Sequence, residues 1–578
     1  MTVTADTIPI PRLAPSAPPA LRPSTAGERV ALACLLLATA ALYGWGLGSA
    51  GWTDPYHAAA VQAMAQDRTA FLFGSTDAGG TVTVDRPPAG LWPMALSARV
   101  FGFSTWSVLV PQALVGVAAV AVLHATVRRV AGPVGGLVAG AVLALMPVTA
   151  GTFRATDPNA LLVLLLVAAA YAVVRATRTA GTGWLLLAGG FVGIAALTHT
   201  AAALVPLPAM ALAHLVAAPT GLRRRVRQLV AAGFALVVAG GWWFALVELT
   251  PAGSRPYVGG SRTDSALERV LTGAGEPAGP GLAGMVDAAH GPFVGWLLPP
   301  ALALFLVGLW LGRGEKRTDP TRASLLLWGG WTVSAALAIG LAGAGVGDAV
   351  VLAPGVAALA GVGGALLWER RRGPAGRAAG ALLVAATAAW MWVVLDRAGE
   401  LPPWWRWAVL AVAALAVAGL LVRPRRVTGT LLGLVLAATV LTGPAALAAP
   451  AVAEGGPGAA PGAIGAGEDG PAPPDAALVE LLRSTSRKWS ASTVGAEDAA
   501  VLALASGTSV LGIGGRDGLD PAPTLEEFQD HVAEREVRWF VDGGPPDRVP
   551  EIAAWVRENF APISVGGRTV YDLDPESP

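Results

Sequence analysis

Residues 106–150 read WSVLVPQALVGVAAVAVLHATVRRVAGPVGGLVAGAVLALMPVTA. The stretch consists of two apolar runs, 106–127 and 132–150, which are separated by Arg128 and Arg129. A helix needs about 20 apolar residues to cross the hydrocarbon core of a bilayer. The stretch therefore predicts two transmembrane helices that are joined by a short basic connection.

The same pattern runs through most of the chain. Of its 578 residues, 54% are hydrophobic and only 14% are charged, against about 25% charged residues in an ordinary soluble domain. Thirteen spans are predicted, at residues 30–48, 106–127, 132–150, 158–174, 182–198, 200–218, 229–248, 292–311, 324–345, 349–368, 378–395, 405–422 and 428–448. We therefore expect a polytopic α-helical membrane protein with about 13 transmembrane helices.

The basic residues predict how these spans are oriented. Every second connection carries a cluster of basic residues: Arg128/Arg129, Arg175/Arg178, Arg223/Arg224/Arg225/Arg227, Arg313/Lys316/Arg317/Arg322, Arg370/Arg371/Arg372/Arg377 and Arg423/Arg425/Arg426. Because connections rich in Lys and Arg stay in the cytoplasm, we expect a plasma-membrane protein with a cytoplasmic N-terminus and an extracytoplasmic C-terminal domain. The single cysteine, Cys34, excludes a disulfide framework within the chain, and the net charge of +1 gives no indication of a nucleic-acid partner.

Composition divides the chain into four parts. Residues 1–29 are Pro-rich and predict a disordered cytoplasmic tail, and residues 30–448 form the membrane domain. Residues 449–474 are rich in Gly, Pro and Ala, which is typical of a linker. Residues 475–578 predict a small extracytoplasmic α/β domain. Its strands are expected at 508–513, 537–542, 562–565 and 569–573, and its helices near 476–485, 495–505, 524–534 and 548–559.

Polar residues gather at the outer ends of the predicted spans. They occur in the long loop after the first span, in the short loop before the fourth, at the turn between the fifth and sixth, and after the seventh. They are Asp54, Asp85, Arg86, Arg154, Asp157, His199, Glu248 and Arg255. Because a charged side chain next to the bilayer is costly, such residues usually have a function.

These residue types indicate a chemistry. Arginine binds phosphate through a planar, two-pronged fork, and a carboxylate can act as the general base that removes a proton from an attacking hydroxyl. A cavity that holds both at the membrane surface fits sugar transfer from a lipid-phosphate carrier, because nucleotide sugars are not expected outside the cytoplasm.

Four stretches carry a resemblance to a known family. They are AAAVQAM (58–64), TVDRPPAGLW (83–92), ALSARVFGFSTWSVLVPQAL (95–114) and PAGSRPYVGGS (251–261). With them the chain resembles the bacterial GT-C glycosyltransferases of the protein O-mannosyltransferase and aminoarabinose-transferase type, especially the actinobacterial branch with a C-terminal extracytoplasmic domain. The resemblance runs from about Gly44 to the C-terminus.

The resemblance implies a hexosyl- or pentosyltransferase that takes its sugar from a polyprenyl phosphate, with inversion, and passes it to an extracytoplasmic acceptor. That acceptor is a lipid, a cell-wall glycan or a protein. Asp54 matches the catalytic base after the first span. Asp85 and Arg86 match the acidic and basic residues of an element whose basic residue lies near the donor phosphate. Arg154 and Arg255 match further basic residues, one of which is expected to bind the phosphate together with Arg86, while Asp85 is expected to support catalysis. Some relatives bind a divalent metal ion near the acidic residue, which makes Asp85 a weak metal candidate, and no other cofactor is implied.

Several positions depart from the family pattern. Arg86 stands where Lys is commoner, and His199 stands where relatives often have Lys. Asp157 and Asn159 are swapped relative to the usual Asn-Pro-Asp order. We expect Asp157 and His199 to lie with the substrate-binding residues. His57 is interpreted as a residue that faces water.

The sequence leaves two other functions open. A transporter or flippase of lipid-linked sugars usually places ionisable groups near the bilayer midplane, often in broken helices or paired repeats. Here the spans are nearly free of charge, the polar groups lie on one face, and no internal repeat is visible, which favours the enzyme. The departures above also allow an inactive relative whose outer domain binds glycans. The Gly512–Gly515 run does not have the spacing of a dinucleotide-binding loop, and the C-terminal domain is expected to recognise the acceptor or cover the cavity.

Overall fold

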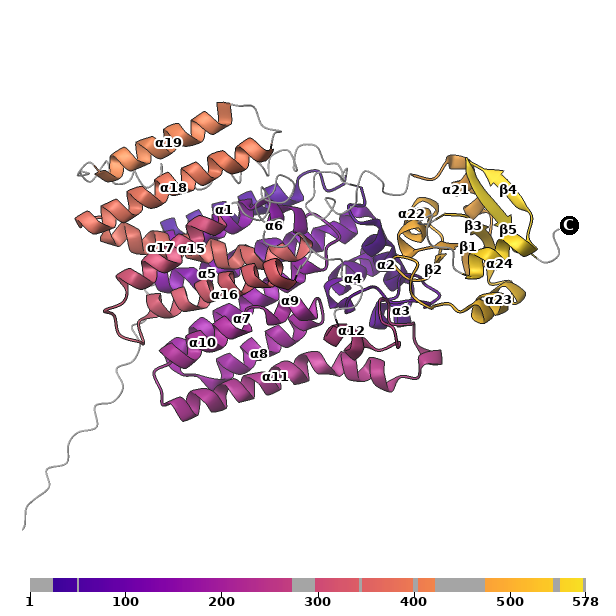
Figure 1. Ribbon diagram of the computed structural model, residues 1–578, viewed down its shortest axis with the longest axis horizontal. Helices are drawn as coiled ribbons and strands as arrows, with labels where there is room; N and C mark the ends of the chain where they lie inside the picture. The colour runs from indigo at the N-terminus through magenta and orange to yellow at the C-terminus, as the bar shows by residue number, and fades with distance from the viewer. Residues whose placement is uncertain are drawn as a thin grey trace, which may run out of the picture.

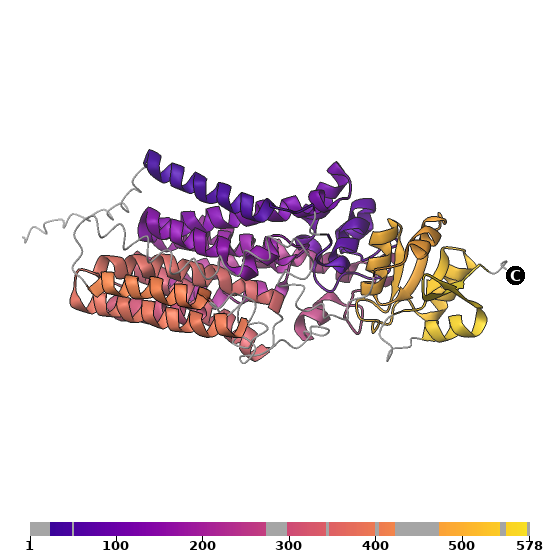
Figure 2. The same ribbon diagram turned by 90° about the horizontal axis from the view of Figure 1, so that it is seen from above.

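The fold is an elongated helical bundle with a sheet-containing domain at one end (Figures 1 and 2). The computed structural model describes residues 24–48, 51–272, 297–342, 346–398, 404–421, 473–543 and 551–574. In both views the yellow C-terminal domain continues the long axis of the bundle. The bundle therefore has one end that is covered by this domain.

Apolar helices form the bundle. They are α1 (Ala26–Gly44), α5 (Thr105–Leu145), α7 (Asn159–Thr179), α8 (Thr182–Ala196), α9 (Thr200–Leu204), α10 (Leu207–Ala217), α11 (Leu222–Leu249), α15 (Leu298–Leu311), α16 (Pro320–Ala342), α17 (Leu352–Arg370), α18 (Pro374–Ala398) and α19 (Trp404–Leu421). Within the described residues, eight helical stretches are long and apolar enough to cross a membrane, and three shorter apolar helices accompany them. The chain is a multi-pass membrane protein.

Most of the predicted spans coincide with these helices. The runs 106–127 and 132–150 are the two arms of α5, which bends at Gly132, a residue with φ of 74°. The twelfth predicted span corresponds to α19, and the thirteenth, 428–448, lies outside the described residues. The count of thirteen spans stays a prediction.

Small residues allow the helices to approach closely. A Cβ atom on Gly189 of α8 would lie 2.1 Å from the carbonyl oxygen of Ala232 in α11, and one on Gly193 would lie 2.4 Å from that of Leu236. Such contacts between small residues are typical of helix packing in membranes, where lipid offers no hydrophobic drive for association.

The arginine-rich connections contact one another. Arg128 forms an ion pair with Glu28 at 2.9 Å, and Arg178 donates to the carbonyl oxygen of Arg129 at 3.0 Å. Arg317 donates to the carbonyl oxygen of Ala218 at 3.3 Å. Among the described residues, the basic connections around residues 128, 178 and 317 therefore lie at one end of the bundle.

The segment between α1 and α5 forms a small layer of its own. It contains α2 (Pro55–Gln66), α3 (Arg68–Phe73), the 3-10 helix η1 (Pro88–Gly90) and α4 (Trp92–Phe101). Asp54 caps α2, because its side chain accepts a hydrogen bond from the His57 amide and Pro55 occupies the first helical position, a favourable start for a helix. Single-residue bridges join Ser75 to Thr83, and Val82 to Tyr257 in the segment after α11.

That later segment contains the 3-10 helix η2 (Ala252–Ser254) and α12 (Ala266–Thr272). A further 3-10 helix, η3 (Val346–Val351), precedes α17, and the short helix α6 (Pro147–Thr152) follows α5. These short elements lie at the ends of the spans.

The C-terminal domain is a five-stranded sheet with helices on both faces. Its strands are β1 (Trp489–Val494), β2 (Val510–Ile513), β3 (Val537–Val541), β4 (Pro562–Val565) and β5 (Arg568–Asp572), and its helices are α21 (Ala476–Arg483), α22 (Ala496–Ser506), α23 (Leu525–Ala533) and α24 (Glu551–Asn559). The order is β2-β1-β3-β5-β4, with β2, β1 and β3 parallel and β5 antiparallel to both of its neighbours. The interior strand β1, second from one edge of the sheet, was not expected from the sequence.

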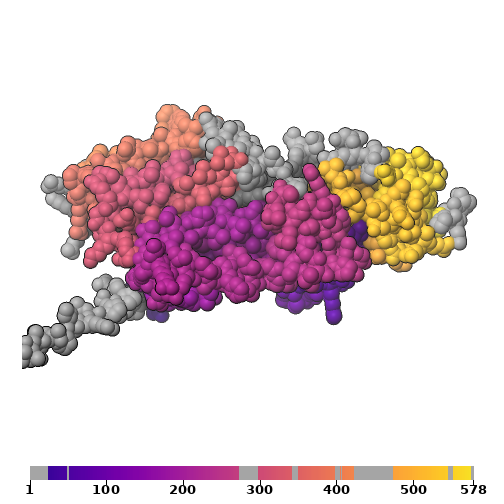
Figure 3. Space-filling model, turned by 60° about the horizontal axis from the view of Figure 1, so that its bottom comes forward, coloured from indigo at the N-terminus to yellow at the C-terminus, as the bar shows by residue number. Residues whose placement is uncertain are grey.

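Polar contacts dock this domain on the layer between α1 and α5. Trp489 Nε1 donates to Asp77 Oδ1 at 2.9 Å, and both residues are buried. The Gly260 amide lies 2.9 Å from Asp520 Oδ2, and Arg516 pairs with Asp85 at 2.9 Å. Figure 3 shows the magenta region that includes the end of α11 against the yellow C-terminal domain. The membrane domain and the sheet domain therefore meet around residues 77–85.

Candidate active site

Asp54 and His57 form a hydrogen-bonded pair on the first turn of α2. His57 Nδ1 donates to Asp54 Oδ2 at 2.6 Å, while Asp54 Oδ1 accepts from the His57 backbone amide at 3.1 Å. The pair forms because the capping residue and the third helical residue lie on the same face of the first turn. The carboxylate thereby fixes the ring orientation and places the proton on Nδ1.

The other ring nitrogen of His57 faces Asp85. His57 Nε2 lies 4.0 Å from Asp85 Oδ1, and neither atom has a hydrogen-bond partner within the described residues. Both side chains are largely buried, at 10% and 14% exposure. Buried polar atoms are usually hydrogen-bonded, so these two atoms have a hydrogen-bonding capacity that the protein itself leaves unused.

Asp85 is held by charged neighbours from several elements. Arg516 pairs with its Oδ2 at 2.9 Å, and Arg269 of α12 donates to its carbonyl oxygen at 2.6 Å. The Tyr56 hydroxyl accepts from its backbone amide at 3.2 Å. The segment that carries Asp85 is thus fixed by α2, α12 and the C-terminal domain together.

The protonation of these groups follows from their surroundings. Burial opposes ionisation of Asp54, but the neighbouring His57 outweighs it and lowers the pKa of the carboxyl. Burial likewise opposes protonation of His57, but Asp54 and Asp85 outweigh it and raise its pKa. Burial of Asp85 is outweighed by Arg516, then Arg86 and His57, so its pKa lies well below the usual range. At neutral pH both carboxylates are ionised.

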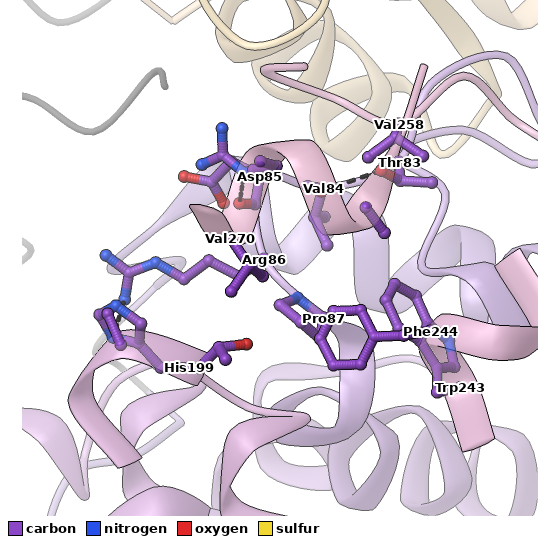
Figure 4. Close-up of a pocket in the computed structure, with 14 residues that line it drawn as sticks. Thr83, Val84, Asp85, Arg86, Pro87, His199, Trp243, Phe244, Val258 and Val270 are labelled. Carbon is purple, nitrogen blue, oxygen red and sulfur yellow. Dashed lines mark hydrogen bonds between the residues drawn. The ribbon is translucent and has the colours of Figure 1, made fainter. Parts of the chain in front are cut away.

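Arg86 and His199 form the basic wall of an adjoining pocket (Figure 4). Arg86 Nη1 donates to His199 Nδ1 at 3.1 Å, which makes this imidazole neutral in the structure because a guanidinium cannot accept a hydrogen bond. The pocket has a volume of about 560 Å³, open solvent included. It is lined by Thr83, Val84, Asp85, Arg86, Pro87, His199, Thr200, Ala201, Trp243, Phe244, Val258, Ala266, Arg269 and Val270.

The pocket has two kinds of surface. Arg86, His199 and Arg269 provide positive charge or hydrogen-bond donors, whereas Pro87, Trp243 and Phe244 provide an apolar wall opposite. Trp243 and Phe244 lie near the end of α11, a membrane-spanning helix. A molecule with an anionic head and an apolar chain matches this combination.

Asp157 also belongs to this neighbourhood. Its Oδ1 accepts a hydrogen bond from the Asn159 amide at 2.8 Å, and its carboxylate interacts electrostatically with His57 and Arg86. Burial raises the pKa of Asp157. The structure thus brings Asp157 close to the same group of residues as Asp85.

Arg154 and Arg255 are engaged elsewhere. The buried Arg154 donates to the carbonyl oxygens of Leu42 and Trp45, each at 2.8 Å, at the C-terminal end of α1. Arg255 forms a 2.7 Å ion pair with Asp264. Neither side chain lines the pocket. Their predicted roles in phosphate binding stay predictions, and the geometry gives both a bracing role.

Glu248 has a bracing role of the same kind. Its Oε1 accepts hydrogen bonds from the Ser265 hydroxyl at 2.8 Å and from the Leu267 amide at 3.0 Å. These bonds satisfy donors at the start of α12, which carries Arg269. Glu248 therefore supports the site from outside.

The metal site suggested for Asp85 stays a prediction. Within the described residues, no group of three or more His, Cys, Asp or Glu side chains could hold a metal ion. The cationic groups around Asp85 are guanidinium groups and His57, which compete with a dication for its carboxylate.

Three residues of the site were missed or undervalued from the sequence: His57, Arg269 and Arg516. The signal for His57 was its spacing, three residues after a capping Asp and next to Pro55. Arg269 and Arg516 gave no such signal, because their neighbours in the chain do not belong to the site. Their positions depend on how distant segments fold together.

Two family models match the sequence. Residues 85–243 match the family "Dolichyl-phosphate-mannose-protein mannosyltransferase", and residues 478–559 match "Putative mannosyltransferase YkcB-like, C-terminal". The first segment begins at Asp85 and includes Arg86, His199 and Trp243. The second includes Arg516 and Asp520.

Curated relatives give the same indication. "Putative mannosyltransferase YkcB" of Bacillus subtilis (strain 168) is 35% identical over 239 residues, which cover 41% of this chain and 33% of the relative. "Putative mannosyltransferase YycA" of the same organism is 34% identical over 238 residues, which cover 41% and 35%. The matched region thus spans about a third of the length of these relatives.

Solved structures share the fold. ArnT from Cupriavidus metallidurans in the apo state has a TM-score of 0.59 and 16% identity, and the match covers 95% of this chain and 98% of ArnT. ArnT bound to undecaprenyl phosphate has a TM-score of 0.55 and 17% identity, with 96% and 100% coverage. The chain is therefore similar to the dolichyl-phosphate-mannose-protein mannosyltransferase family over residues 85–243, to the YkcB-like C-terminal family over residues 478–559, and to ArnT in its fold.

Proposed function

We propose that the protein is a membrane glycosyltransferase that moves a sugar from a polyprenyl-phosphate donor to an acceptor outside the cytoplasm. The proposal rests mainly on the positions of Asp85 and Arg86, which are adjacent in sequence. Asp85 lies next to His57 of the Asp54–His57 pair, and both Asp85 and Arg86 line a pocket with basic and apolar walls. The two B. subtilis relatives, named as mannosyltransferases, and the undecaprenyl phosphate in one ArnT structure support it.

The pocket suits the donor. Arg86 and Arg269 supply guanidinium groups for the phosphate, and His199 supports Arg86 through its 3.1 Å hydrogen bond. The wall of Pro87, Trp243 and Phe244 suits the first prenyl units. The sugar would then lie towards Asp85 and His57. A transfer assay with a panel of donors distinguishes a hexose from a pentose.

The acceptor hydroxyl fits between His57 Nε2 and Asp85 Oδ1. His57, held by Asp54, takes the hydroxyl proton as the oxygen forms a bond to the anomeric carbon. The bond between that carbon and the phosphate oxygen breaks, and its electron pair leaves with the polyprenyl phosphate. Attack opposite the leaving phosphate inverts the anomeric configuration. Asp54 is thus part of the base through His57.

The site lies on the outer side of the membrane in this proposal. Among the described residues, the arginine-rich connections around residues 128, 178 and 317 lie at one end of the bundle, and the long outer loops of the alternation carry most of the site. By the bias of basic residues towards the cytoplasm, the site and the C-terminal domain face outward. The donor would reach the pocket from the outer leaflet.

The test is sugar transfer by purified full-length protein in liposomes, with radiolabelled polyprenyl-phosphate mannose, aminoarabinose and arabinose offered separately. We expect transfer from one donor, and its loss by about 10²–10³-fold in Asp54→Asn and in His57→Gln. Asp542→Asn, which alters an ion pair with Arg557 in the C-terminal domain, serves as the control. Absence of transfer with every donor, together with protein-dependent movement of the lipid across the bilayer, would overturn the proposal in favour of a flippase.

A further inference from the structure

A loop of the C-terminal domain reaches over the candidate active site. It follows β2 and contains Gly514, Gly515 and Gly518, all with positive φ. Asp520 binds the Gly260 amide through both carboxylate oxygens, at 2.9 and 3.1 Å. The loop is thus fixed to the membrane domain beside the site.

Arg516 is the residue that this loop places in the site. Its Nη1 lies 2.9 Å from Asp85 Oδ2, and its Nε lies 2.9 Å from Glu497 Oε1 at the start of α22. Its guanidinium carbon lies 4.9 Å from the centre of the Tyr56 ring. An arginine that is paired twice and stacked on an aromatic ring has one defined orientation.

The segment that receives Arg516 is held on both sides by the same domain. Asp77, near one end, accepts from Trp489 of β1, while Asp85 at the other end pairs with Arg516. A Cβ atom at Gly79 would lie 2.1 Å from the Trp489 ring, which shows how closely the two domains meet. Residues 77–85 therefore take their position partly from the C-terminal domain.

We propose that Arg516 is a positioning residue of the active site, which acts as the counter-ion of Asp85 and makes the C-terminal domain part of the donor site. This inference rests on the proposed function, because it gives Arg516 a role in binding the donor phosphate. The domain then has a task in the reaction that does not depend on recognising an acceptor.

The reason is the balance of charge. Asp85 is adjacent to Arg86, and its carbonyl oxygen binds Arg269, so its carboxylate lies close to the groups proposed to bind phosphate. An uncompensated carboxylate there would repel an anionic donor and draw the two guanidinium groups towards itself. Arg516 compensates that charge from the far side of Asp85, and Arg86 and Arg269 keep their attraction for the phosphate.

The experiment measures binding and transfer separately. Purified full-length protein in neutral-lipid nanodiscs is titrated with undecaprenyl phosphate at two salt concentrations, and KM and kcat are measured with the donor found active. We expect Arg516→Gln to weaken undecaprenyl-phosphate binding about tenfold and to raise KM more than it lowers kcat. We expect Arg516→Lys, which keeps the charge, to recover most of the affinity, and Arg516→Gln to show the weaker salt dependence.

Two matched variants control for structure. Arg557→Gln removes an arginine of the same domain that pairs with Asp542 and not with Asp85, and we expect unchanged binding. Glu497→Gln removes the second partner of Arg516 but keeps the pair with Asp85, and we expect affinity within about twofold of the wild type. Hydrogen exchange over residues 75–86 shows whether Arg516→Gln still docks its C-terminal domain.

The outcomes separate this inference from the proposed function. Equal affinity and equal KM in wild type and Arg516→Gln would overturn the inference, while transfer by both would leave the proposed function intact. Failure of Arg516→Lys to recover any affinity, in a protein whose exchange matches the wild type, would also overturn the role as counter-ion. A third outcome is that no donor supports transfer, while Arg516→Gln still binds undecaprenyl phosphate about tenfold more weakly than the wild type. This outcome would support the inference and contradict the proposed reaction.

Discussion

Asp54 and His57 show how a local helix start can prepare a catalytic group. The two side-chain oxygens of Asp54 accept hydrogen bonds from the backbone amide and from the imidazole of His57. The contacts that cap the helix therefore also orient the imidazole ring. His57 Nε2 is then directed at Asp85, which Arg516 keeps ionised. The base proposed here is therefore a pair, and each member depends on the other.

The pair predicts a specific dependence on pH. His57 faces the carboxylates of Asp54, Asp85 and Asp157 and the guanidinium of Arg516; burial lowers its pKa, but Asp54 and then Asp85 raise it above the ordinary value. Because only the neutral imidazole can accept a proton, kcat/KM should fall as pH drops through this raised pKa. In Asp54→Asn the pKa should drop, so the acid limb should move to lower pH while the maximal rate falls.

Rate–pH profiles of the wild type and of Asp54→Asn test this dependence. Asp542→Asn is the control, because its ion pair with Arg557 involves neither Asp54 nor His57. An acid limb that stays at the same pH in Asp54→Asn would show that the titrating base is not His57.

Arg86 allows a second test at the residue scale. Its guanidinium donates to His199 and lines the pocket, whereas a lysine would supply charge without the planar fork. We expect Arg86→Lys to raise the donor KM less than about tenfold and Arg86→Gln to raise it about a hundredfold, with kcat less affected in both. Steady-state kinetics with a fixed acceptor concentration measures this, and equal effects of the two variants would contradict a role in binding the phosphate.

At the scale of elements, the long apolar runs were predictable because each must fill the bilayer thickness by itself. The strand β1 was missed, since in its sequence WSASTV apolar and polar residues alternate over only the first four positions. All six of its residues are buried, because it is an interior strand between β2 and β3. An interior strand of small and hydroxyl residues has no period that distinguishes it from a loop.

Some residues of the site could be predicted from the sequence and others could not. Asp54, Asp85 and Arg86 could be selected from the sequence because they are charged groups in loops next to apolar runs. Arg516 could not, because more than 400 residues separate it from Asp85 and only the docking of two domains joins them. The bonds of Arg154 to carbonyl oxygens at the end of α1 were equally invisible, since a sequence does not show which helix ends meet.

Gly79 lies where the C-terminal domain contacts the membrane domain. It faces the Trp489 ring, and even a methyl group there would overlap with it, so Gly79→Ala should weaken docking of the C-terminal domain. We expect faster hydrogen exchange over residues 75–86 and in β1, and a lower affinity for undecaprenyl phosphate. Gly253→Ala is the control, because a methyl group there meets no atom within 4 Å. Unchanged exchange in Gly79→Ala would contradict the docking described here.

At the scale of the whole molecule, the reaction requires that the site and the C-terminal domain face the same side of the membrane. The arginine clusters predict that this side is the outside. The test uses Cys34→Ala protein with one new cysteine, either Thr318→Cys in the basic connection before α16 or Glu526→Cys on α23, both at exposed positions. On intact cells, a membrane-impermeant maleimide should label Glu526→Cys at once and Thr318→Cys only after permeabilisation. The reverse pattern would place the pocket in the cytoplasm, where nucleotide sugars are available, and would remove the reason for a lipid-linked donor.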